Sequence, residues 1–536
     1  MVYITVGIYF AVLLWLGVVA SRRVRTLSDY YLGGKQLGYW VAAFSARATG
    51  ESAWLYLGLT GLGAAVGLSA LWVVVGEVVG VSIAWFFMAT PFKAATDRAD
   101  AITVPDYLVS RFGSDAAPHM TRWLRLVAAG ALTIFVTIYV SAQIDATGQA
   151  FVNFLDWNYF VGALVGFGIV AAYTFSGGFL AVAWSDLFQG LLMLVGLVVL
   201  PLAAVAALSP GALPLSVDPA LLNPWGPGGL NLPNALTIVS YAAIGLGYLG
   251  SPQVFVRLMA IKSQKDILAG RWVAVAFTLA TDTGAVLSGF FGRALLVGSD
   301  GDFVATLGPA GEQVLPVLVE HLFPAVVVGI FVAAVLAAIM STIDSLLMVA
   351  SSAVTRDVYQ QTLHPERASA TLTGLSRRVT LTLAVIALGI AMAVAVLVPG
   401  RTIFWFVIFG WSGIAATFCP MMVLSLCWRR YNAQGAMASM LTGLIAIPVF
   451  KFLVPLVPGW GDLVTRAEEL APSFLASLLA GVIVTLATTN LNQDRVVGAT
   501  AVPNREVFLA RRDEGSDRTG RNREATPPSG RLARKI

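Results

Sequence analysis

The segment SARATGESAW, residues 45–54, carries two opposite charges inside a long apolar run. Arg47 and Glu51 are four positions apart, so they would face each other on a continuous helix. A charge at the centre of a membrane costs at least about 2.5–3.5 kcal/mol, so such residues are usually paired or functional. We therefore predict an intramembrane charge network in which Arg47 pairs with Glu51 or with Glu77 of the next apolar run. The open alternatives are a purely structural ion pair, or a Glu51 side chain that attracts a cation or carries a proton.

A later apolar run, residues 333–352, contains a stripe of hydroxyl groups next to a carboxylate. Ser341, Thr342 and Ser345 are spaced so that they lie on one face of a helix, and Asp344 is beside them. Hydroxyl and carboxylate oxygens bind small hard cations, whereas copper and zinc prefer sulfur or imidazole. The run therefore predicts a sodium site. Hydrogen bonding back to their own helix is the alternative for the hydroxyls, but it does not account for Asp344.

The composition places these residues in a membrane protein. Of the 536 residues, 57% are hydrophobic and 12% are charged, against about 25% charged in soluble proteins. Cys419 and Cys427 lie in one apolar run and the three histidines are scattered, which gives neither a disulfide framework nor a metal-binding spacing. The net charge of +5 reflects basic loops, so a nucleic-acid partner is not expected. No nucleophile with its base and no nucleotide-binding loop is evident, so an enzyme is not expected either.

Apolar runs of about 20 residues, the length that spans a bilayer, predict an all-α polytopic membrane protein with about 13 transmembrane helices. The expected spans are residues 3–20, 38–62, 68–90, 122–148, 158–177, 179–207, 234–258, 272–297, 322–355, 377–398, 403–427, 434–455 and 474–490. Lys and Arg gather in alternate loops, one of them containing Arg257, which predicts an outside N-terminus and a cytoplasmic C-terminus in the cell (inner) membrane. Residues 1–490 are expected to form the transmembrane domain, and residues 491–536 a disordered cytoplasmic tail.

Two of the expected spans contain residues that interrupt a helix. Gly50 lies in the middle of the second span, and residues 242–253 of the seventh contain glycines and a proline. Breaks at corresponding places of two halves are typical of transporters with inverted repeats and a binding site near the membrane midplane. We therefore predict a five-plus-five core with broken helices, made of residues 38–207 and residues 234–427. The alternative is that these glycines only allow helices to pack closely.

Six segments together resemble the sodium/solute symporter family, and most closely its sodium/proline symporter branch. Each segment alone is modest, but their order and spacing are specific, and the resemblance extends from about residue 5 to about residue 490. The segments are GGKQLGYWVAAFSA (33–46), TVPDYLVSRF (103–112), FSGGFLAVAWSDLFQ (175–189), GLGYLGSPQVFVRLMA (245–260), LAAIMST (336–342) and FGWSGIAATFCP (409–420).

The resemblance implies a main sodium site and, as in some family members, a second one. In the main site, backbone carbonyls at the second-span break and groups of the ninth span hold the ion. The matching residues are Ala48, Glu51, Ala338, Ser341 and Thr342. A second cation would lie between the sixth and ninth spans, at Asp186, Ser341, Asp344 and Ser345. Two carboxylates there would repel each other without a cation or a shared proton between them.

The resemblance also implies a substrate site beside the two breaks. Freed helix ends offer N–H groups to a carboxylate, and aromatic rings can stack on an apolar ring, although each ring alone is equally consistent with ordinary packing. The chain has Gly50 and Glu51 where the proline branch has Asp and Met, and Ile244 where that branch has Trp. These departures bear on substrate identity. The matching residues are Ser52, Ala53, Trp54, Tyr139, Tyr248 and Pro252.

These features predict a sodium-coupled secondary active symporter that imports a small organic solute by alternating access, with proline or a related amino acid as the first choice. The alternatives are a symporter for a sugar, a carboxylate or another solute, with coupling to protons as a further option, and, in a different class, a transporter-like membrane solute sensor. Sodium is the only metal expected, as a co-transported ion. Besides the lipid bilayer and the solute, no organic cofactor and no obligate protein partner is expected.

Overall fold

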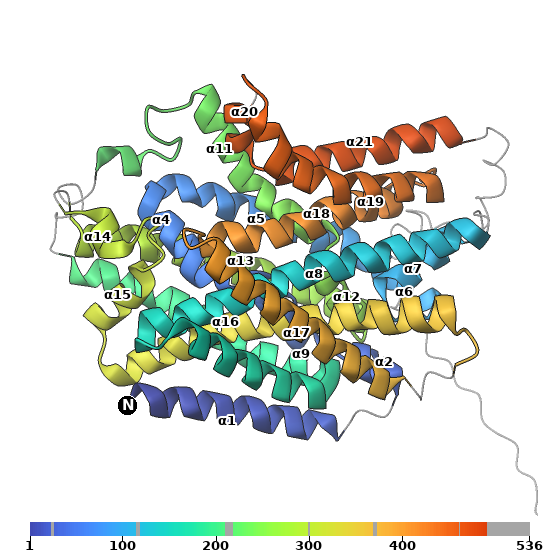
Figure 1. Ribbon diagram of the computed structural model, residues 1–536, viewed down its shortest axis with the longest axis horizontal. Helices are drawn as coiled ribbons and strands as arrows, with labels where there is room; N and C mark the ends of the chain where they lie inside the picture. Colours follow the sequence, from blue (N-terminus) through green and yellow to red (C-terminus); the bar gives the residue numbers. More distant parts are fainter. Residues whose placement is uncertain are drawn as a thin grey trace, which may run out of the picture. The chain divides into compact units, whose positions relative to one another are not determined.

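The apolar runs of the sequence form helices that lie side by side, mostly along one common direction (Figure 1). The computed structural model describes residues 1–22, 26–113, 118–208, 218–298, 301–367, 372–459 and 461–489. Within these ranges there is no β-strand, and a single β-bridge joins Leu37 to Ile261. The expected all-α architecture is therefore confirmed. The expected cytoplasmic tail, residues 491–536, lies outside the described residues.

Long helices form the framework of the chain. They are α1 (Val2–Ser21), α3 (Tyr39–Ala53), α5 (Leu71–Ile83), α8 (Pro118–Leu155), α9 (Tyr159–Ala207), α11 (Leu232–Ala243), α13 (Gln264–Leu296), α16 (Ala325–Ser352), α17 (Thr373–Leu397), α18 (Ile403–Cys427), α19 (Ala433–Pro448) and α21 (Leu470–Thr488).

Shorter helical pieces extend or connect the long helices. They are α2 (Leu27–Leu32), η1 (Gly33–Lys35), η2 (Trp54–Leu59), α4 (Thr60–Val66), η3 (Gly67–Ala70), η4 (Ala84–Met88), α6 (Ala89–Arg98), α7 (Val104–Phe112), η5 (Pro219–Leu222), η6 (Ile244–Leu249), α12 (Pro252–Ala260), α14 (Phe303–Leu307), α15 (Val314–Leu322), η7 (Ala353–Leu363), η9 (Val449–Leu453), η10 (Val454–Leu456) and α20 (Gly461–Ala467).

Eleven helices of the described part are long and apolar enough to cross a membrane. One of them is the run Tyr39–Arg98, whose 60 residues, at about 1.5 Å each, exceed the length of a single crossing. Helix α9 covers the expected fifth and sixth spans and is kinked at Gly178, whose φ of 59° suits a glycine. The count of 13 spans stays a prediction, while the polytopic helical class is confirmed.

The first break lies two residues later than expected. Gly50 keeps a helical conformation, whereas Ser52 has φ 47° and ψ −166°, a region that residues with a Cβ rarely adopt. The π-helix η2 follows directly after Ala53. Gly50 is needed for a different reason, because a Cβ there would lie 2.5 Å from the Tyr248 hydroxyl and 2.8 Å from its ring atom Cε1. Gly50 therefore makes room for the ring of Tyr248, and it does not bend the helix.

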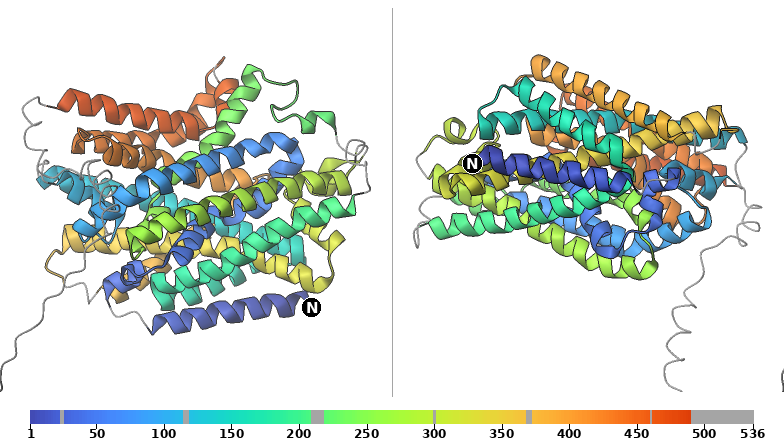
Figure 2. Two further views of the ribbon diagram at one scale, coloured as in Figure 1. Left: turned by 180° about the vertical axis from the view of Figure 1, so that it is seen from behind. Right: turned by 90° about the horizontal axis from the view of Figure 1, so that it is seen from below.

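The second break separates α11 from α12. The chain passes through the 3₁₀ turn η6 and restarts as a helix at Pro252, where proline's missing N–H costs nothing. A Cβ on Gly76 or Gly80 of α5 would clash with the backbone of Ala242 and Gly245, so α5 and this break touch backbone to backbone. Seen from behind, the blue helices of residues 39–98 lie beside the yellow-green helix α13, which contacts α3, α4 and α5 (Figure 2).

Helix α16 forms the centre of the bundle. Every residue from Phe331 to Ser352 is buried, and α16 contacts α1, α3, α8 and α9. A polar stripe on such a helix has no access to lipid or water, so its hydroxyl groups must form hydrogen bonds within the protein. This burial places the stripe against the first break.

Candidate functional site

The hydroxyl groups of α16 bind backbone carbonyls of α3 just before its break. Ser341 Oγ donates to the carbonyl oxygens of Ala48 and of Ala338, both at 3.0 Å. Thr342 Oγ1 lies 3.1 Å from the carbonyl oxygen of Thr49 and 3.2 Å from that of Ala338. Five neutral oxygen atoms from two helices thus meet at one point. Such an all-oxygen set suits a small hard cation such as sodium.

Four of the five residues predicted for the main sodium site are therefore in one place. The fifth, Glu51, directs its carbonyl oxygen to the backbone N–H of Trp54. The Trp54 indole N–H in turn donates to the carbonyl oxygen of Gly50 at 3.1 Å. The carbonyl oxygen of Thr49 is the fifth oxygen of the group in its stead. The sequence analysis missed Thr49, although it directly follows Ala48 in the sequence.

The residues predicted for a second cation surround a guanidinium group. Arg257 of α12 lies 3.3 Å from Asp186 Oδ2 and also donates to Ser345 Oγ. Its Nε donates to Ser45 Oγ at 3.1 Å, and Ser45 donates to Asp186 Oδ2 at 2.6 Å. The assignment of Arg257 to a cytoplasmic loop was wrong, because the side chain is fully buried. The sequence could not indicate this position, because the partners of Arg257 lie far away from it in the chain.

Asp344 completes this group of charges. Ser345 Oγ donates to Asp344 Oδ1 at 3.2 Å and lies 2.9 Å from Thr49 Oγ1. Asp186 and Asp344 thus share the electrostatic field of Arg257. The guanidinium supplies a positive charge where the sequence led us to expect a second sodium ion. The second ion stays a prediction, and any ion there must share the two carboxylates with Arg257.

The substrate residues predicted at the first break form hydrogen bonds with side chains of α8. The Tyr139 hydroxyl lies 3.3 Å from Ser52 Oγ, and the backbone N–H of Ala53 donates to Gln143 Oε1 at 3.0 Å. Gln143 therefore satisfies an N–H group that the break sets free. The sequence analysis missed Gln143, although it lies one helical turn after Tyr139.

Trp411 of α18 joins the second break to Tyr139 of α8. Its indole N–H donates to the carbonyl oxygen of Ile244 at 2.9 Å, and its ring centroid is 5.0 Å from that of Tyr248 and 6.3 Å from that of Tyr139. Trp54, Tyr139 and Tyr248 are at most 2% exposed, so this aromatic group is closed off from the surface. Pro252 is also buried, at the start of α12.

The charge network around Arg47 is larger than expected. Arg47 pairs with Glu51 and lies 3.4 Å from Glu77 Oε2, as the sequence led us to expect. The guanidinium also stacks 4.4 Å from the centroid of the Tyr248 ring. Asp282 of α13 faces the same group. All of these side chains are buried, so the network belongs to the interior, close to the first break.

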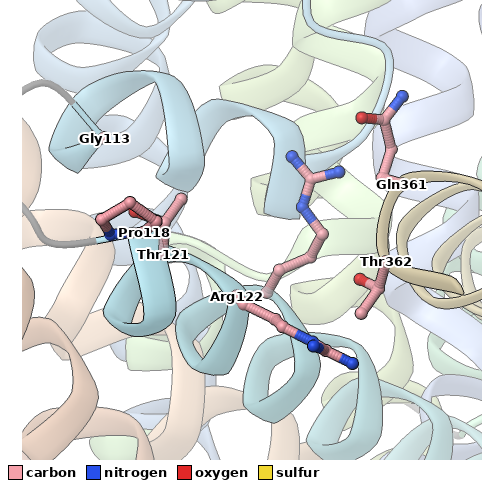
Figure 3. Close-up of a pocket in the computed structure, with 7 residues that line it drawn as sticks. Gly113, Pro118, Thr121, Arg122, Gln361 and Thr362 are labelled. Atoms are coloured by element: carbon pink, nitrogen blue, oxygen red, sulfur yellow. The ribbon is translucent and has the colours of Figure 1, made fainter. Parts of the chain in front are cut away.

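A surface pocket of about 400 Å³ lies elsewhere, between the start of α8 and η7. Figure 3 shows Thr121 and Arg122 facing Gln361 and Thr362 across it. Two arginines, Arg122 and Arg125, make its lining basic. None of the predicted sodium or substrate residues takes part in it.

Comparisons with known proteins point to one family of membrane transporters. The model of the "Sodium:solute symporter family" matches residues 30–443. The chain is 34% identical over 488 residues to the osmoregulated proline transporter OpuE of Bacillus subtilis, covering 91% of this chain and 95% of that protein. It is 35% identical over 481 residues to the high-affinity proline transporter PutP of the same organism, covering 89% and 96%.

The fold also has a counterpart among solved structures. A Na⁺-coupled sialic acid symporter in a substrate-bound, outward-open state superimposes with a TM-score of 0.70. The match covers 91% of this chain and 98% of that chain at 18% sequence identity. At this level of identity the likeness shows a shared fold.

Proposed function

Because the chain belongs to the sodium:solute symporter family, and is thus a multi-pass membrane transporter of a small molecule, we propose that it imports proline together with sodium ions. The observation that supports sodium coupling best is the contact of Ser341 and Thr342 with the carbonyl oxygens of Ala48 and Thr49. It joins the buried central helix α16 to the break in α3 through groups that a sodium ion would bind.

Sodium coupling follows from this shared position. A sodium ion at Ala48, Thr49, Ala338, Ser341 and Thr342 would replace the direct hydrogen bonds between hydroxyl and carbonyl groups. The ion would then hold the end of α3 in one conformation, and the adjoining residues Ser52 to Trp54 with it. Ion and substrate would raise each other's affinity, as thermodynamic linkage requires.

Proline as the substrate is supported by the named relatives and by the residues next to the breaks. Trp54, Tyr139 and Tyr248 offer flat apolar surfaces for a pyrrolidine ring. The chain differs from the proline branch at Gly50, Glu51 and Ile244. These differences favour, as a second candidate substrate, another small solute with a similar apolar body and different polar groups.

We place the protein in the cell membrane with the N-terminus outside, on the strength of the basic loops. Within the described residues, Arg111 precedes α8 and Arg429 and Arg430 follow α18, on expected cytoplasmic sides. The five-plus-five repeat over residues 38–207 and 234–427 is supported by the two breaks, at Ser52 and at η6.

Reconstitution of the purified full-length chain into proteoliposomes tests the proposal. Labelled proline should accumulate only when a sodium gradient points inward. A panel of labelled amino acids, sugars and carboxylates under sodium and proton gradients supplies the comparison. Proline uptake that persists after sodium is replaced by choline would refute sodium coupling. Accumulation of another solute, with none of proline, would refute the substrate.

A further inference from the structure

The surface pocket between the start of α8 and η7 is basic. Its volume is about 400 Å³, and the described residues that line it include two arginines and no aspartate or glutamate. Arg122 and Arg125 are one helical turn apart on α8, so both belong to the same wall. Gln361 of η7, on the opposite wall, adds a side-chain amide that can donate hydrogen bonds (Figure 3). The pocket therefore offers positive charge and hydrogen-bond donors to whatever it binds.

Arg125 is held in place but is not fully paired. Its Nη2 lies 3.7 Å from Asp106 Oδ1, and the other oxygen of that carboxylate lies 3.5 Å from Arg356 Nε. One carboxylate thus serves two guanidinium groups. Arg125 is only 9% exposed, and its Nη1 has no hydrogen-bond partner among the described residues. Because a buried charged donor without an acceptor is unfavourable, an acceptor bound in the pocket would stabilise this side chain.

The second arginine of the wall has no carboxylate of its own. Arg122 is exposed, and none of the ion pairs within the described ranges includes it. The other carboxylate of this group, Asp357, is fully buried, accepts a hydrogen bond from Thr103 at 3.0 Å and does not line the pocket. An anion with several oxygen atoms can therefore bind both guanidinium groups. Phosphate has this property, and its oxygen atoms match the planar fork of arginine donors.

Trp123 indicates where the pocket lies relative to the bilayer. It stands between the two arginines in the sequence and is 59% exposed on α8. Exposed tryptophans gather at the level of the lipid head groups, and basic pockets between helices at that level bind anionic head groups. In the proposed orientation this end of α8 is cytoplasmic, so phosphate compounds dissolved in the cytoplasm reach the pocket as well.

We propose that this pocket is a binding site for an anionic phosphate group, with Arg122 and Arg125 as its main ligands and Gln361 as a further donor. Such a group has two sources, the head group of an anionic phospholipid or a phosphate compound in solution. The bound phosphate bridges α8 to η7, which directly continues helix α16. It thereby holds the end of the helix that carries Ser341 against α8. This binding does not depend on which solute the protein transports.

Native mass spectrometry of the detergent-solubilised full-length protein tests the lipid source. The probes are anionic phosphatidylglycerol and net-neutral phosphatidylcholine with the same acyl chains. The wild-type protein should prefer phosphatidylglycerol. Arg122→Gln and Arg125→Gln should each weaken phosphatidylglycerol binding at least about tenfold, because each removes a charge-assisted hydrogen bond. Arg378→Gln is the matched control, since it removes an exposed arginine of α17 outside the pocket and should keep the wild-type preference.

Isothermal titration calorimetry with inorganic phosphate, in detergent without added lipid, tests the source in solution. Both pocket variants should bind phosphate at least about tenfold more weakly than wild type and Arg378→Gln. Lipid preference without phosphate binding assigns the pocket to a head group, phosphate binding without lipid preference assigns it to a dissolved compound, and both together mean that it accepts either.

Arg122→Gln decides the test if Arg125→Gln fails to fold, because Arg122 is exposed and its replacement leaves the buried pair of Arg125 and Asp106 intact. The proposal is overturned if the wild-type protein neither prefers phosphatidylglycerol nor binds inorganic phosphate. It is equally overturned if Arg122→Gln binds both probes as the wild-type protein does.

Discussion

Arg257 Nη2 lies 3.3 Å from Asp186 Oδ2, and both side chains are fully buried between α12 and α9. The same guanidinium also binds the backbone carbonyl of Gln253 at 2.7 Å. It thus ties the helix after the second break to helix α9. A buried ion pair of this kind contributes little over a well-packed apolar pair, but removal of one partner leaves a buried charge without compensation.

We therefore expect Arg257→Leu to destabilise the protein by about 3–5 kcal/mol, because Asp186 loses its partner. The double variant Arg257→Leu with Asp186→Leu should recover part of this loss, as expected for residues in direct contact. Denaturant unfolding of the detergent-solubilised protein measures both values. The exposed Arg378→Leu is the control and should stay close to wild type. Additive losses in the double variant would contradict the pairing.

The sodium dependence of uptake should weaken when Ser341 is changed to alanine. The variant loses a ligand to a charged ion, a loss of about 1.5–3 kcal/mol, which corresponds to a rise of at least tenfold in the sodium concentration at half-maximal uptake. Ser351→Ala is the matched control, because Ser351 is equally buried on α16 and donates only to Met348 of its own helix, at 3.1 Å. Equal sodium dependence in the two variants would refute the site.

Gly50→Ala should impair transport because the new Cβ would meet the Tyr248 ring, with 2.5 Å to its hydroxyl oxygen and 3.0 Å to Cζ. We expect a loss of about 1–3 kcal/mol from overpacking, with a matching fall in uptake. Adding Tyr248→Phe removes the nearest atom and should restore part of the activity. Gly130→Ala is the control, since a Cβ there meets nothing within 4 Å. If Tyr248→Phe does not restore activity, the loss in Gly50→Ala does not come from a clash with the Tyr248 hydroxyl.

Glu468, in the loop before α21, should make stability depend on pH. Burial, and the neighbouring Glu469, raise the pKa of this carboxyl from 4.5 to about 7, against the lowering effect of Lys451 at 3.1 Å. The folded protein then binds the proton more tightly than the unfolded chain. The contribution of Glu468 to the stability of the fold is therefore present below about pH 4.5 and is lost as the pH rises through about 7.

Thermal unfolding of the wild-type protein and of Glu468→Gln at a series of pH values checks this sign. The advantage of wild type over the variant should shrink as the pH rises through that window. Glu320→Gln, at an exposed position, should leave the pH dependence as it is in wild type. A constant difference between wild type and Glu468→Gln would contradict the prediction.

Much of the architecture was predictable because it depends on local patterns. The expected span 403–427 coincides with α18, and the expected gap between the fifth and sixth spans coincides with the kink at Gly178. Apolar length and glycine position determine such features within one segment. The sequence led us to expect the break of α3 at Gly50, whereas the structure has it at Ser52. Gly50 is instead required by the close approach of Tyr248, which belongs to a distant segment and could not be predicted locally.

The sequence by itself determined the membrane class, the family and the two broken regions, since these follow from apolar runs and ordered motifs. It also indicated that Arg47 and Glu51 would pair, as residues one helical turn apart. Only the tertiary structure placed Asp282 against Glu51, Gln143 against Ala53 and Arg257 between Asp186 and Ser345. Each of these contacts joins residues far apart in the chain. Packing of whole helices decides which buried charges meet, and no local pattern carries that information.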